Sequence, residues 1–413
     1  MNYAAATRLM HLVRRRRFAP VLAFRRQVCE FCRTVRYGTV RAESRFRMES
    51  TTLLPGSSSR LSDPVSATGK TPHLVAVVLN KNARAVTQRQ IRRVADINGA
   101  DHVFVSSSVE DSRRFVCTIV ERGYHTVLFG GGDGTFVCCV NDLLAECARQ
   151  ARPVPRVGVL RLGTGNAIGY YVGVQPPNER GLRTEIARAA ELESSTRELP
   201  LLKVDGKLAP FAGTGLDSQI LDDYAATTRA IDRMGLGSIL GSGFRYTLAV
   251  GLRSVPRFMM RRLPQVEVVN VGGPAYAIGV DGRVDPVSLP RGTVLYRGPC
   301  TLAGAATVPC YGFGVRIFPF ADMRPDKFQL RCTDASAMEA LSHLPSVLRG
   351  TYRSATLRDF LCDAVEIHME HPVPMQIGGD IQRDHRDFMR IDLADRPVRL
   401  VWPKPPTPAD ATL

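Results

Sequence analysis

Two glycine-rich stretches of this chain contain the residue types that bind phosphate. The first, Gly130-Gly131-Gly132-Asp133-Gly134-Thr135, follows an apolar run at Thr126–Phe129 and precedes a helical pattern. Glycines between a strand and a helix let the backbone approach phosphate oxygens, while exposed N–H groups and the positive helix end attract anions. Asp133 fits such a place if it holds Mg²⁺ or orients a hydroxyl nucleophile. The alternative is a turn in which the glycines serve backbone geometry only.

The second stretch, Leu160-Arg161-Leu162-Gly163-Thr164-Gly165-Asn166-Ala167, also follows an apolar strand. It places Gly163, Thr164, Gly165 and Asn166 at the carboxyl end of that strand, where parallel sheets bind their ligands. Two such loops at one edge of a sheet can face a single nucleotide.

The elements that must position these loops alternate in type. Short apolar runs alternate with polar stretches that repeat at helical spacing. The predicted order is strand Leu74–Leu79, helix Thr87–Asn98, strand Val103–Val105, helix Glu110–Gly123, strand Thr126–Phe129, helix Phe136–Gln150 and strand Val157–Leu162. This order predicts a doubly wound α/β nucleotide-binding domain with a parallel sheet.

After about residue 197 the pattern changes to short β-like runs separated by Gly and Pro, which predicts a second, β-rich and sandwich-like domain. The expected strands are Leu199–Val204, Val266–Val271, Tyr276–Val280, Thr293–Arg297, Val315–Phe318, Phe328–Arg331, Val365–Met369 and Arg399–Val401. Within it, Tyr224–Leu263 is helical in pattern. Its apolar stripe at Tyr246–Met260, rimmed by Arg, is either core packing or an interfacial helix.

These shifts divide the chain into an Arg-rich arm (1–47), a flexible linker (48–72), the α/β domain (73–197), the β-rich domain (198–402) and a tail (403–413). The arm could be a transit-like peptide or could touch anionic lipid. A start at Met48 is the other interpretation, because the order-promoting pattern begins only after Pro72.

Composition limits the function classes. The chain has 413 residues, 44% of them hydrophobic and 23% charged, which is typical of a folded globular protein. Its formal charge is +16, but residues 1–47 alone contain twelve Arg and only two Glu, so the charge does not indicate a nucleic-acid binder. Ten scattered Cys fit a reducing cytoplasm. No apolar run is long enough to span a membrane, and we expect a cytoplasmic protein that can associate peripherally with the inner face of the membrane.

The two glycine stretches together resemble a known family. Gly-Gly-Gly-Asp-Gly-Thr at 130–135, followed six residues later by Asn141, and Leu-Gly-Thr-Gly-Asn-Ala at 162–167 are similar to the catalytic domain of the diacylglycerol kinase and sphingosine kinase family of lipid kinases. NAD kinases share part of this core. The resemblance runs from about Val75 to Trp402 and implies that Asn80, which matches the family's first-strand Asn, contacts nucleotide.

At other positions the sequence matches the family's motifs only in part. Ala167 stands where many bacterial relatives have Asp, and Gly378 stands where the family has the Asp of an Asp-Gly-Glu turn. Asp380 replaces the Glu of that turn, and the resemblance implies that it supplies the general base. The stretch Phe211–Asp217 is similar to a family segment that ends in Gly-x-Asp. For Asp217 this implies a role toward the substrate hydroxyl or a metal, against the alternative of a helix N-cap.

We therefore expect an ATP-dependent phosphotransferase with an alcohol acceptor, using Mg²⁺ and acting on a lipid such as diacylglycerol or a sphingoid base at a membrane surface. Asp133 and Asp380 are the expected catalytic residues. The alternatives are an NAD-kinase-like enzyme with a soluble acceptor and a non-catalytic nucleotide or lipid sensor, because Ala167 and Gly378 both remove acids that relatives use. The sequence does not assign the individual lipid or the oligomeric state.

Overall fold

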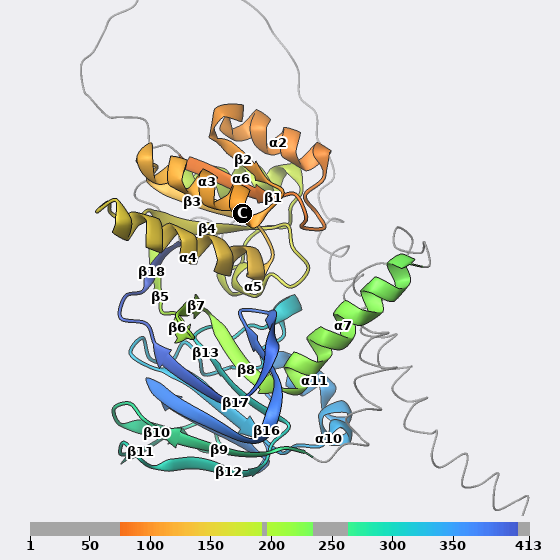
Figure 1. The fold of residues 1–413 in the computed structure, drawn as a ribbon, viewed down its shortest axis with the longest axis vertical. Coiled ribbons are helices and arrows are strands. Elements are labelled where there is room, and N and C mark those ends of the chain that lie inside the picture. Colours follow the sequence, from red (N-terminus) through yellow and green to blue (C-terminus); the bar gives the residue numbers. More distant parts are fainter. Residues whose placement is uncertain (1–74, 192–195, 234–262, 404–413) are drawn as a thin grey trace, which may run out of the picture. The chain divides into compact units, whose positions relative to one another are not determined.

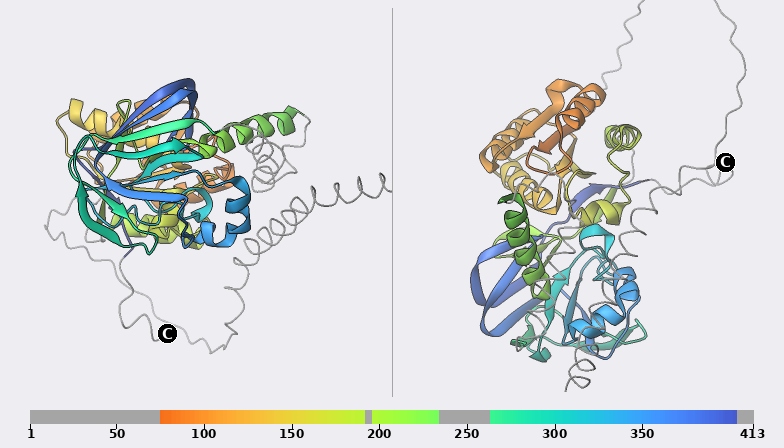
Figure 2. Two further views of the ribbon diagram at one scale, coloured as in Figure 1. Left: turned by 90° about the horizontal axis from the view of Figure 1, so that it is seen from below. Right: turned by 90° about the vertical axis from the view of Figure 1, so that its right-hand side faces the viewer.

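The fold was analysed in a computed structural model, which describes residues 75–191, 196–233 and 263–403 (Figures 1 and 2). All of them belong to one compact unit, Pro72–Leu413. The Arg-rich arm, the linker, the stripe at Tyr246–Met260 and nearly all of the tail lie outside the described residues.

A six-stranded sheet forms the first lobe, here called the α/β lobe (residues 75–199 and 398–401). Its strand order is β2 (Val103–Ser106), β1 (Val75–Asn80), β3 (Thr126–Gly131), β4 (Arg156–Arg161), β18 (Val398–Val401) and β5 (Thr196–Leu199). The first five strands are parallel, and β5 runs antiparallel to β18. Because β3 and β4 are neighbours, Gly131 pairs with Arg161 and the two glycine segments leave the sheet side by side.

Helices cover both faces of this sheet, as Figures 1 and 2 show: α2 (Gln88–Asn98), α3 (Val109–Glu121), α4 (Asp133–Arg149), α5 (Ala167–Val172) and α6 (Glu179–Ala190). Alternate strand residues divide between two cores. Val78 and Phe129 pack with α3 and α4, whereas Leu79 and Leu128 pack with α2 and α6. This period-two alternation in buried strands confirms the doubly wound α/β architecture.

The second lobe, here called the β lobe (residues 202–393), is a large and mostly antiparallel twelve-stranded sheet. Its strands are β6 (Leu202–Val204), β7 (Lys207–Ala209), β8 (Phe211–Gly215), β9 (Gln265–Asn270), β10 (Ala275–Ile278), β11 (Val284–Leu289), β12 (Val294–Pro299), β13 (Leu302–Ala306), β14 (Phe328–Thr333), β15 (Leu357–Cys362), β16 (Ala364–Ile377) and β17 (Asp380–Leu393). The helices of this lobe are α7 (Leu216–Arg233), η3 (Gly312–Gly314), α10 (Ala337–Ser342) and α11 (Leu344–Arg349).

The long strand β16 connects two parts of this sheet. Its first half, Val365–Met369, pairs with β9, and its last residues, Met375–Ile377, pair with β8. Between them the register against β17 shifts at His368–Val373. A strand that bends and changes partner in this way turns a sheet corner. The far end of β16 is thereby brought next to β8 and, through the turn that follows, to the α/β lobe.

Several strand predictions need correction. Pro200 divides the expected strand Leu199–Val204, because proline lacks the N–H that a continuing ladder requires; β5 ends before it, in one sheet, and β6 begins after it, in the other. Residues Val315–Phe318 form no strand, because the N–H groups of Arg316 and Phe318 donate to the carbonyls of Leu348 and Pro309, which lie outside the strands. The strand expected at Arg399–Val401 belongs to the α/β lobe rather than to the β-rich half.

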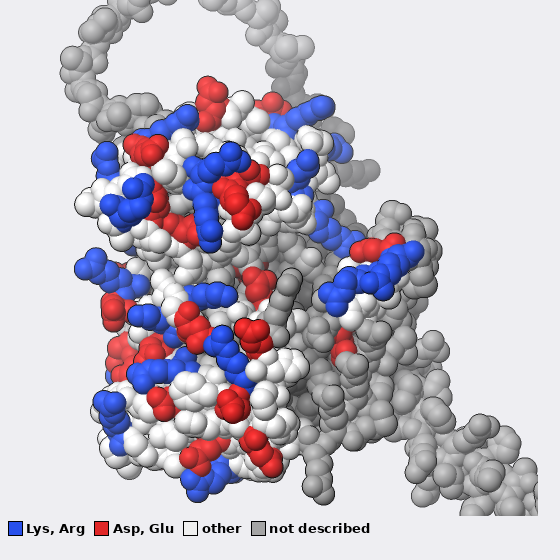
Figure 3. Space-filling model, viewed as in Figure 1, with Lys and Arg blue, Asp and Glu red and all other residues white. Residues whose placement is uncertain are grey.

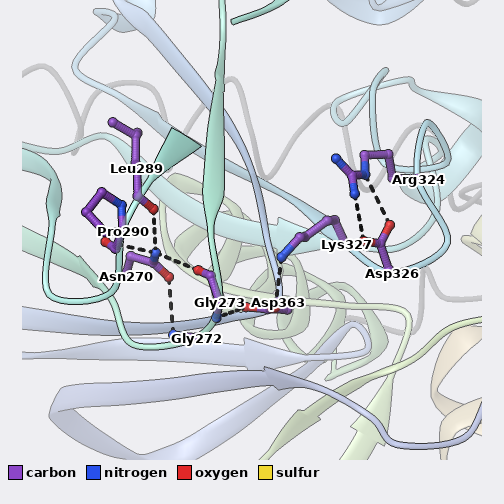
Figure 4. Close-up of polar contacts among 9 residues, drawn as sticks. All are labelled: Asn270, Gly272, Gly273, Leu289, Pro290, Arg324, Asp326, Lys327 and Asp363. Atoms are coloured by element: carbon purple, nitrogen blue, oxygen red, sulfur yellow. Dashed lines mark hydrogen bonds and ion pairs between the residues drawn. The ribbon is translucent and has the colours of Figure 1, made fainter. Parts of the chain in front are cut away.

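Side chains fix the turns at the far end of the β lobe (Figure 4). The fully buried Asn270 donates to the carbonyls of Gly273, Leu289 and Pro290, and its own carbonyl accepts from Gly272. The Asp363 carboxylate accepts from the Gly273 N–H and pairs with the buried Lys327 ammonium at 2.8 Å. Because these buried polar groups are partnered, this end of the lobe is held rigidly.

The surface carries both signs of charge. On the face in Figure 3, basic and acidic side chains are interspersed over both lobes. Some charges of opposite sign form ion pairs in the structure, among them Arg113–Asp142 in the α/β lobe and Arg390–Glu366 in the β lobe. Among the helices of the described residues, none combines the length and the apolar character needed to cross a bilayer.

Candidate active site

The two glycine segments contact each other through their backbones. A Cβ atom placed on Gly163 would lie 2.1 Å from the Cα atom of Gly132 and 2.3 Å from its nitrogen. No side chain other than hydrogen fits between them. The segments after β3 and β4 therefore form one continuous backbone surface at the carboxyl edge of the sheet, which is where α/β sheets bind ligands.

The first glycine segment contains almost no loop, although its glycines suggest one. Strand β3 continues through Gly131, and α4 begins at Asp133, so that only Gly132 separates them. Gly132 provides no side-chain cap, and the first N–H groups of a helix have no acceptor within the helix. The amides of Gly134 and Thr135 lie in that first turn. A helix start of this kind, at the end of a strand, attracts phosphate.

Asp133 connects the two segments. Its carboxylate accepts hydrogen bonds from the backbone N–H groups of Ala167 and Ile168, at the start of α5. One carboxylate oxygen, Oδ2, lies only 2.8 Å from the position that a Cβ on Gly165 would take. Burial raises the pKa of Asp133 to about 6; the nearby charge of Asp380 adds to this rise, and the backbone hydrogen bonds oppose it. Asp133 can therefore change its charge close to neutral pH.

The two asparagines that were expected to contact nucleotide also bind within the protein. Asn166 has a left-handed backbone with φ 54°, and its amide both donates to the Gly163 carbonyl at 2.7 Å and accepts from the Gly163 N–H at 3.2 Å. Asn80, at the end of β1, donates from Nδ2 to Oγ1 of Thr135 at 2.9 Å. Each amide thus fixes the shape of one glycine segment.

Asp380 arrives from the β lobe at the same helix start. It follows the two-residue turn Gly378-Gly379, whose φ angles of 61° and 87° belong to the type I′ turn that joins antiparallel strands. Its Oδ1 atom lies 2.9 Å from the position of a Cβ on Gly134. Burial raises the pKa of Asp380, and the ammonium of Lys207 opposes this rise. Among the described residues, none donates a hydrogen bond to this carboxylate.

The departure at Gly378 from the family pattern has a local structural basis. A Cβ on Gly378 would lie 2.4 Å from Cγ2 of Val137 on α4. The turn is therefore seated directly on the helix, and its left-handed φ favours glycine as well. Glycine at this position therefore allows the turn to contact α4 directly.

Asp217 is not brought to this site by any described contact. Helix α7 begins at Leu216, so Asp217 lies inside its first turn and not at an N-cap, which corrects that alternative. Its side chain lies outside the described residues.

Sequence reasoning missed the positively charged neighbour of Asp380. Lys207 follows the Asp205-Gly206 turn between β6 and β7, and its ammonium donates to the side chain of Gln382 at 3.0 Å. The Asp-Gly pair, with both φ angles positive, was the available signal, since it marks a tight hairpin. No local pattern, however, indicates that this hairpin meets Asp380.

The role of Asn141 was missed too. Its amide donates from Nδ2 to the Leu208 carbonyl at 2.7 Å and accepts the Leu208 N–H at 2.8 Å. A side chain on α4 thus pairs with the backbone of β7 as a neighbouring strand would. Asn141 lies seven residues after Gly134, two helical turns along the face of α4 that meets the β lobe.

We expect Asn141→Ala to lower the free energy of unfolding by about 3 kcal/mol, because it leaves both backbone groups of Leu208 without their partners. Urea unfolding measures this change. Asn178→Ala is the matched control, since it removes one partly buried hydrogen bond that caps α6 and should cost about 1 kcal/mol. Equal losses in the two variants would contradict a special role for Asn141 between the lobes.

Comparisons with known proteins agree with this geometry. Residues 75–198 match the diacylglycerol kinase catalytic domain. The resemblance based on the two glycine segments is confirmed over this range. The chain is 32% identical over 118 residues to the "Probable lipid kinase YegS" of Escherichia fergusonii, covering 28% of this chain and 38% of that relative. It is 36% identical over 86 residues to the "Probable lipid kinase YegS-like" of Citrobacter koseri, covering 21% and 28%.

The matches to these curated relatives thus span less than two fifths of their length. The structural likeness is wider. A crystal structure of a diacylglycerol kinase from Bacillus anthracis superimposes with a TM-score of 0.53 at 14% identity, covering 82% of this chain and 99% of that one. The segment that matches the diacylglycerol kinase catalytic domain therefore lies within a two-lobed fold that resembles that crystal structure.

Proposed function

We propose that this protein is an ATP-dependent lipid kinase that transfers the γ-phosphoryl group of ATP to a hydroxyl group of a lipid. One observation carries the proposal: Asp133 and Asp380, from different lobes, meet at the start of α4, where the two glycine segments are in backbone contact. Phosphoryl transfer depends mainly on positioning and on neutralising charge. We propose that the backbone amides, the helix start and the two carboxylates together provide the positioning and the charge neutralisation.

The choice of a lipid as the acceptor is supported by the relatives and by the second lobe. The relatives with similar α/β segments are named as lipid kinases, and the structural neighbour that shares both lobes is a diacylglycerol kinase. We propose diacylglycerol or a sphingoid base as the substrate class, presented at a membrane surface. A kinase of NAD or another soluble acceptor is the second candidate, favoured by the same glycine segments.

In the proposed reaction, the lipid hydroxyl oxygen forms a bond to the γ-phosphorus, the bond from that phosphorus to the β–γ bridging oxygen breaks, and ADP leaves. Asp380 takes the hydroxyl proton, because its carboxylate has a raised pKa and no hydrogen-bond donor among the described residues. Asp133 holds the two glycine segments in contact. Asp133 is also the carboxylate that would hold Mg²⁺, and the metal would supply neutralisation of the phosphate charge.

The test is transfer of labelled phosphate. ATP labelled in its γ-phosphate is incubated with Mg²⁺ and either vesicles containing diacylglycerol, vesicles containing sphingosine, or NAD in solution. We expect label in an extracted lipid and a loss of at least about a hundredfold in Asp380→Ala. Asp380→Glu is the conservative control and should retain more activity than Asp380→Asn, because Glu keeps a carboxylate at this position whereas Asn does not.

Each other result points to a different function. Label in the NAD arm alone would replace the lipid kinase by a kinase of a soluble acceptor. Nucleotide binding without transfer in any arm would favour the sensor. Full lipid labelling by Asp380→Ala would remove Asp380 from the mechanism while leaving the lipid kinase in place.

A further inference from the structure

The position of Asp380 depends on a glutamine two residues before the Gly378-Gly379 turn. Gln376 is 1% exposed, and its side-chain carbonyl accepts the N–H of Gly379 at 2.9 Å. The N–H of Gly378 donates to the Phe211 carbonyl at 2.8 Å. Both turn amides therefore have fixed partners. A buried amide side chain that binds the turn sets where the next residue, Asp380, begins its strand.

Tyr311 fixes the other end of that glutamine. The Gln376 Nε2 group donates to the Tyr311 hydroxyl. The Tyr311 ring packs between Phe211, at 4.5 Å between ring centroids, and Phe318, at 6.0 Å. Its backbone N–H donates to the Val315 carbonyl at 2.7 Å. Because the ring and backbone are held, the hydroxyl presents a fixed acceptor that orients the Gln376 amide.

The residue after Tyr311 touches the second glycine segment. A Cβ on Gly312 would lie 3.4 Å from the Cα atom of Gly165, so the two backbones are in close contact. Gly165 in turn lies against the carboxylate of Asp133. The Tyr311-Gly312 segment of the β lobe therefore contacts the proposed phosphate-binding backbone on one side and the Gln376 side chain on the other.

We propose that Tyr311 and Gln376 are a positioning pair for Asp380, and that Gly312 ties this pair to the second glycine segment. The inference rests on the proposed function for its kinetic consequences. The pair does not touch substrate; it acts through Asp380 alone. It orients the turn so that the Asp380 carboxylate meets Gly134 at the start of α4, which makes the base part of the same rigid assembly as the glycine segments.

Kinetics provide the first test. Tyr311→Phe removes only the hydroxyl, and Gln376→Met removes the hydrogen bonds to Tyr311 and Gly379 at nearly constant volume. We expect kcat for lipid phosphorylation to fall about tenfold in the first and more in the second, with KM for ATP changed less than about twofold, because small misplacements of a reacting group cost rate more than binding. Tyr352→Phe, which removes a phenol bonded to Glu339 elsewhere in the β lobe, is the matched control and should keep wild-type kcat.

A double-mutant cycle separates positioning from general damage. In an Asp380→Asn background, Tyr311→Phe should change the residual rate less than about twofold, since the group that it positions is already gone. Equal losses with and without Asp380 would overturn the inference, because a merely structural residue lowers both rates alike.

Hydrogen exchange gives a test that needs no activity. Exchange of the Gly379 amide should accelerate at least about tenfold in Gln376→Met, while the Gly378 amide, bonded to the Phe211 carbonyl, exchanges as in the wild type. Unchanged exchange at Gly379 would refute the positioning pair. If the wild-type protein transfers phosphate to no acceptor, the proposed function fails, whereas the exchange result still decides whether Tyr311 and Gln376 hold the turn.

Discussion

Replacing Asp133 with Asn will lower kcat by at least about a hundredfold and leave the folded protein at least as stable at about pH 7.5. The amide oxygen of Asn can still accept hydrogen bonds from Ala167 and Ile168. The variant loses the negative charge, however, and with it both the proposed contribution to transfer and the cost of burying that charge beside Asp380. Initial rates and thermal unfolding measure the two effects. Wild-type turnover, or a large loss of stability, would contradict this assignment.

The stability gain should depend on pH in a defined direction. The carboxyl pKa of Asp133 is 3.8 without the fold and about 6 within it. Between these values the folded protein keeps a proton that the unfolded chain has released, so wild-type stability falls as pH rises through this window. The Asp133→Asn variant has no such dependence. The stability advantage of Asp133→Asn over the wild type should therefore be full above about pH 6 and disappear near about pH 4.

Replacing Gly132 and Gly163 with alanine should affect different properties. Gly132→Ala should weaken ATP binding without loss of stability, whereas Gly163→Ala should lower stability. A Cβ on Gly132 would lie 3.6 Å from its nearest neighbour, which is ordinary contact, and the backbone φ of −102° accepts any residue. Gly132→Ala should therefore fold normally. Its methyl group would occupy the space beside the start of α4 where we place the triphosphate, so we expect the Kd for ATP to rise at least about tenfold. Calorimetry measures the affinity.

Gly163→Ala should instead destabilise the fold. Its Cβ would meet the backbone of Gly132 at 2.1 Å, and no side-chain rotation relieves a contact between two backbones. We expect the free energy of unfolding to fall by about 3 kcal/mol or more, because β3 and β4 must separate at their ends. Unaltered ATP affinity in Gly132→Ala would exclude this surface as the phosphate site, and unaltered stability of Gly163→Ala would refute the backbone contact.

The α/β lobe was predictable because its signals are local. Buried parallel strands appear as apolar runs and their helices as amphipathic repeats, so the bounds of β1, β3 and α4 differ from prediction by a few residues at most. The two glycine segments could be placed at one sheet edge for the same reason. What sequence did not indicate is that Asp133 binds the start of α5, since that contact depends on how tightly the two segments approach.

The β lobe was less predictable because its decisive contacts are distant in sequence. Strand β17 was not predicted at all: Arg383 through Asp387 is a run of charged side chains without period-two alternation, and β17 becomes a strand through pairing with β16 and β6. The bond between Gln376 and Tyr311 joins residues 65 positions apart. Likewise, Asn141 and Leu208 are 67 positions apart. Contacts between residues so far apart in the chain produce no local spacing pattern, so a single sequence does not indicate them.

The return of β18 to the α/β lobe affects how the protein is synthesised. Among the described strands, β5 pairs with β18 alone, and β18 lies between β5 and β4. Residues 398–401 emerge from the ribosome after the entire β lobe. During translation, β4 therefore remains an open edge of the sheet that could pair with the wrong segment, and the sheet of the α/β lobe is completed only after the β lobe has been synthesised. Loss of a few residues in β18 would consequently harm a lobe whose other strands all precede the β lobe in the chain.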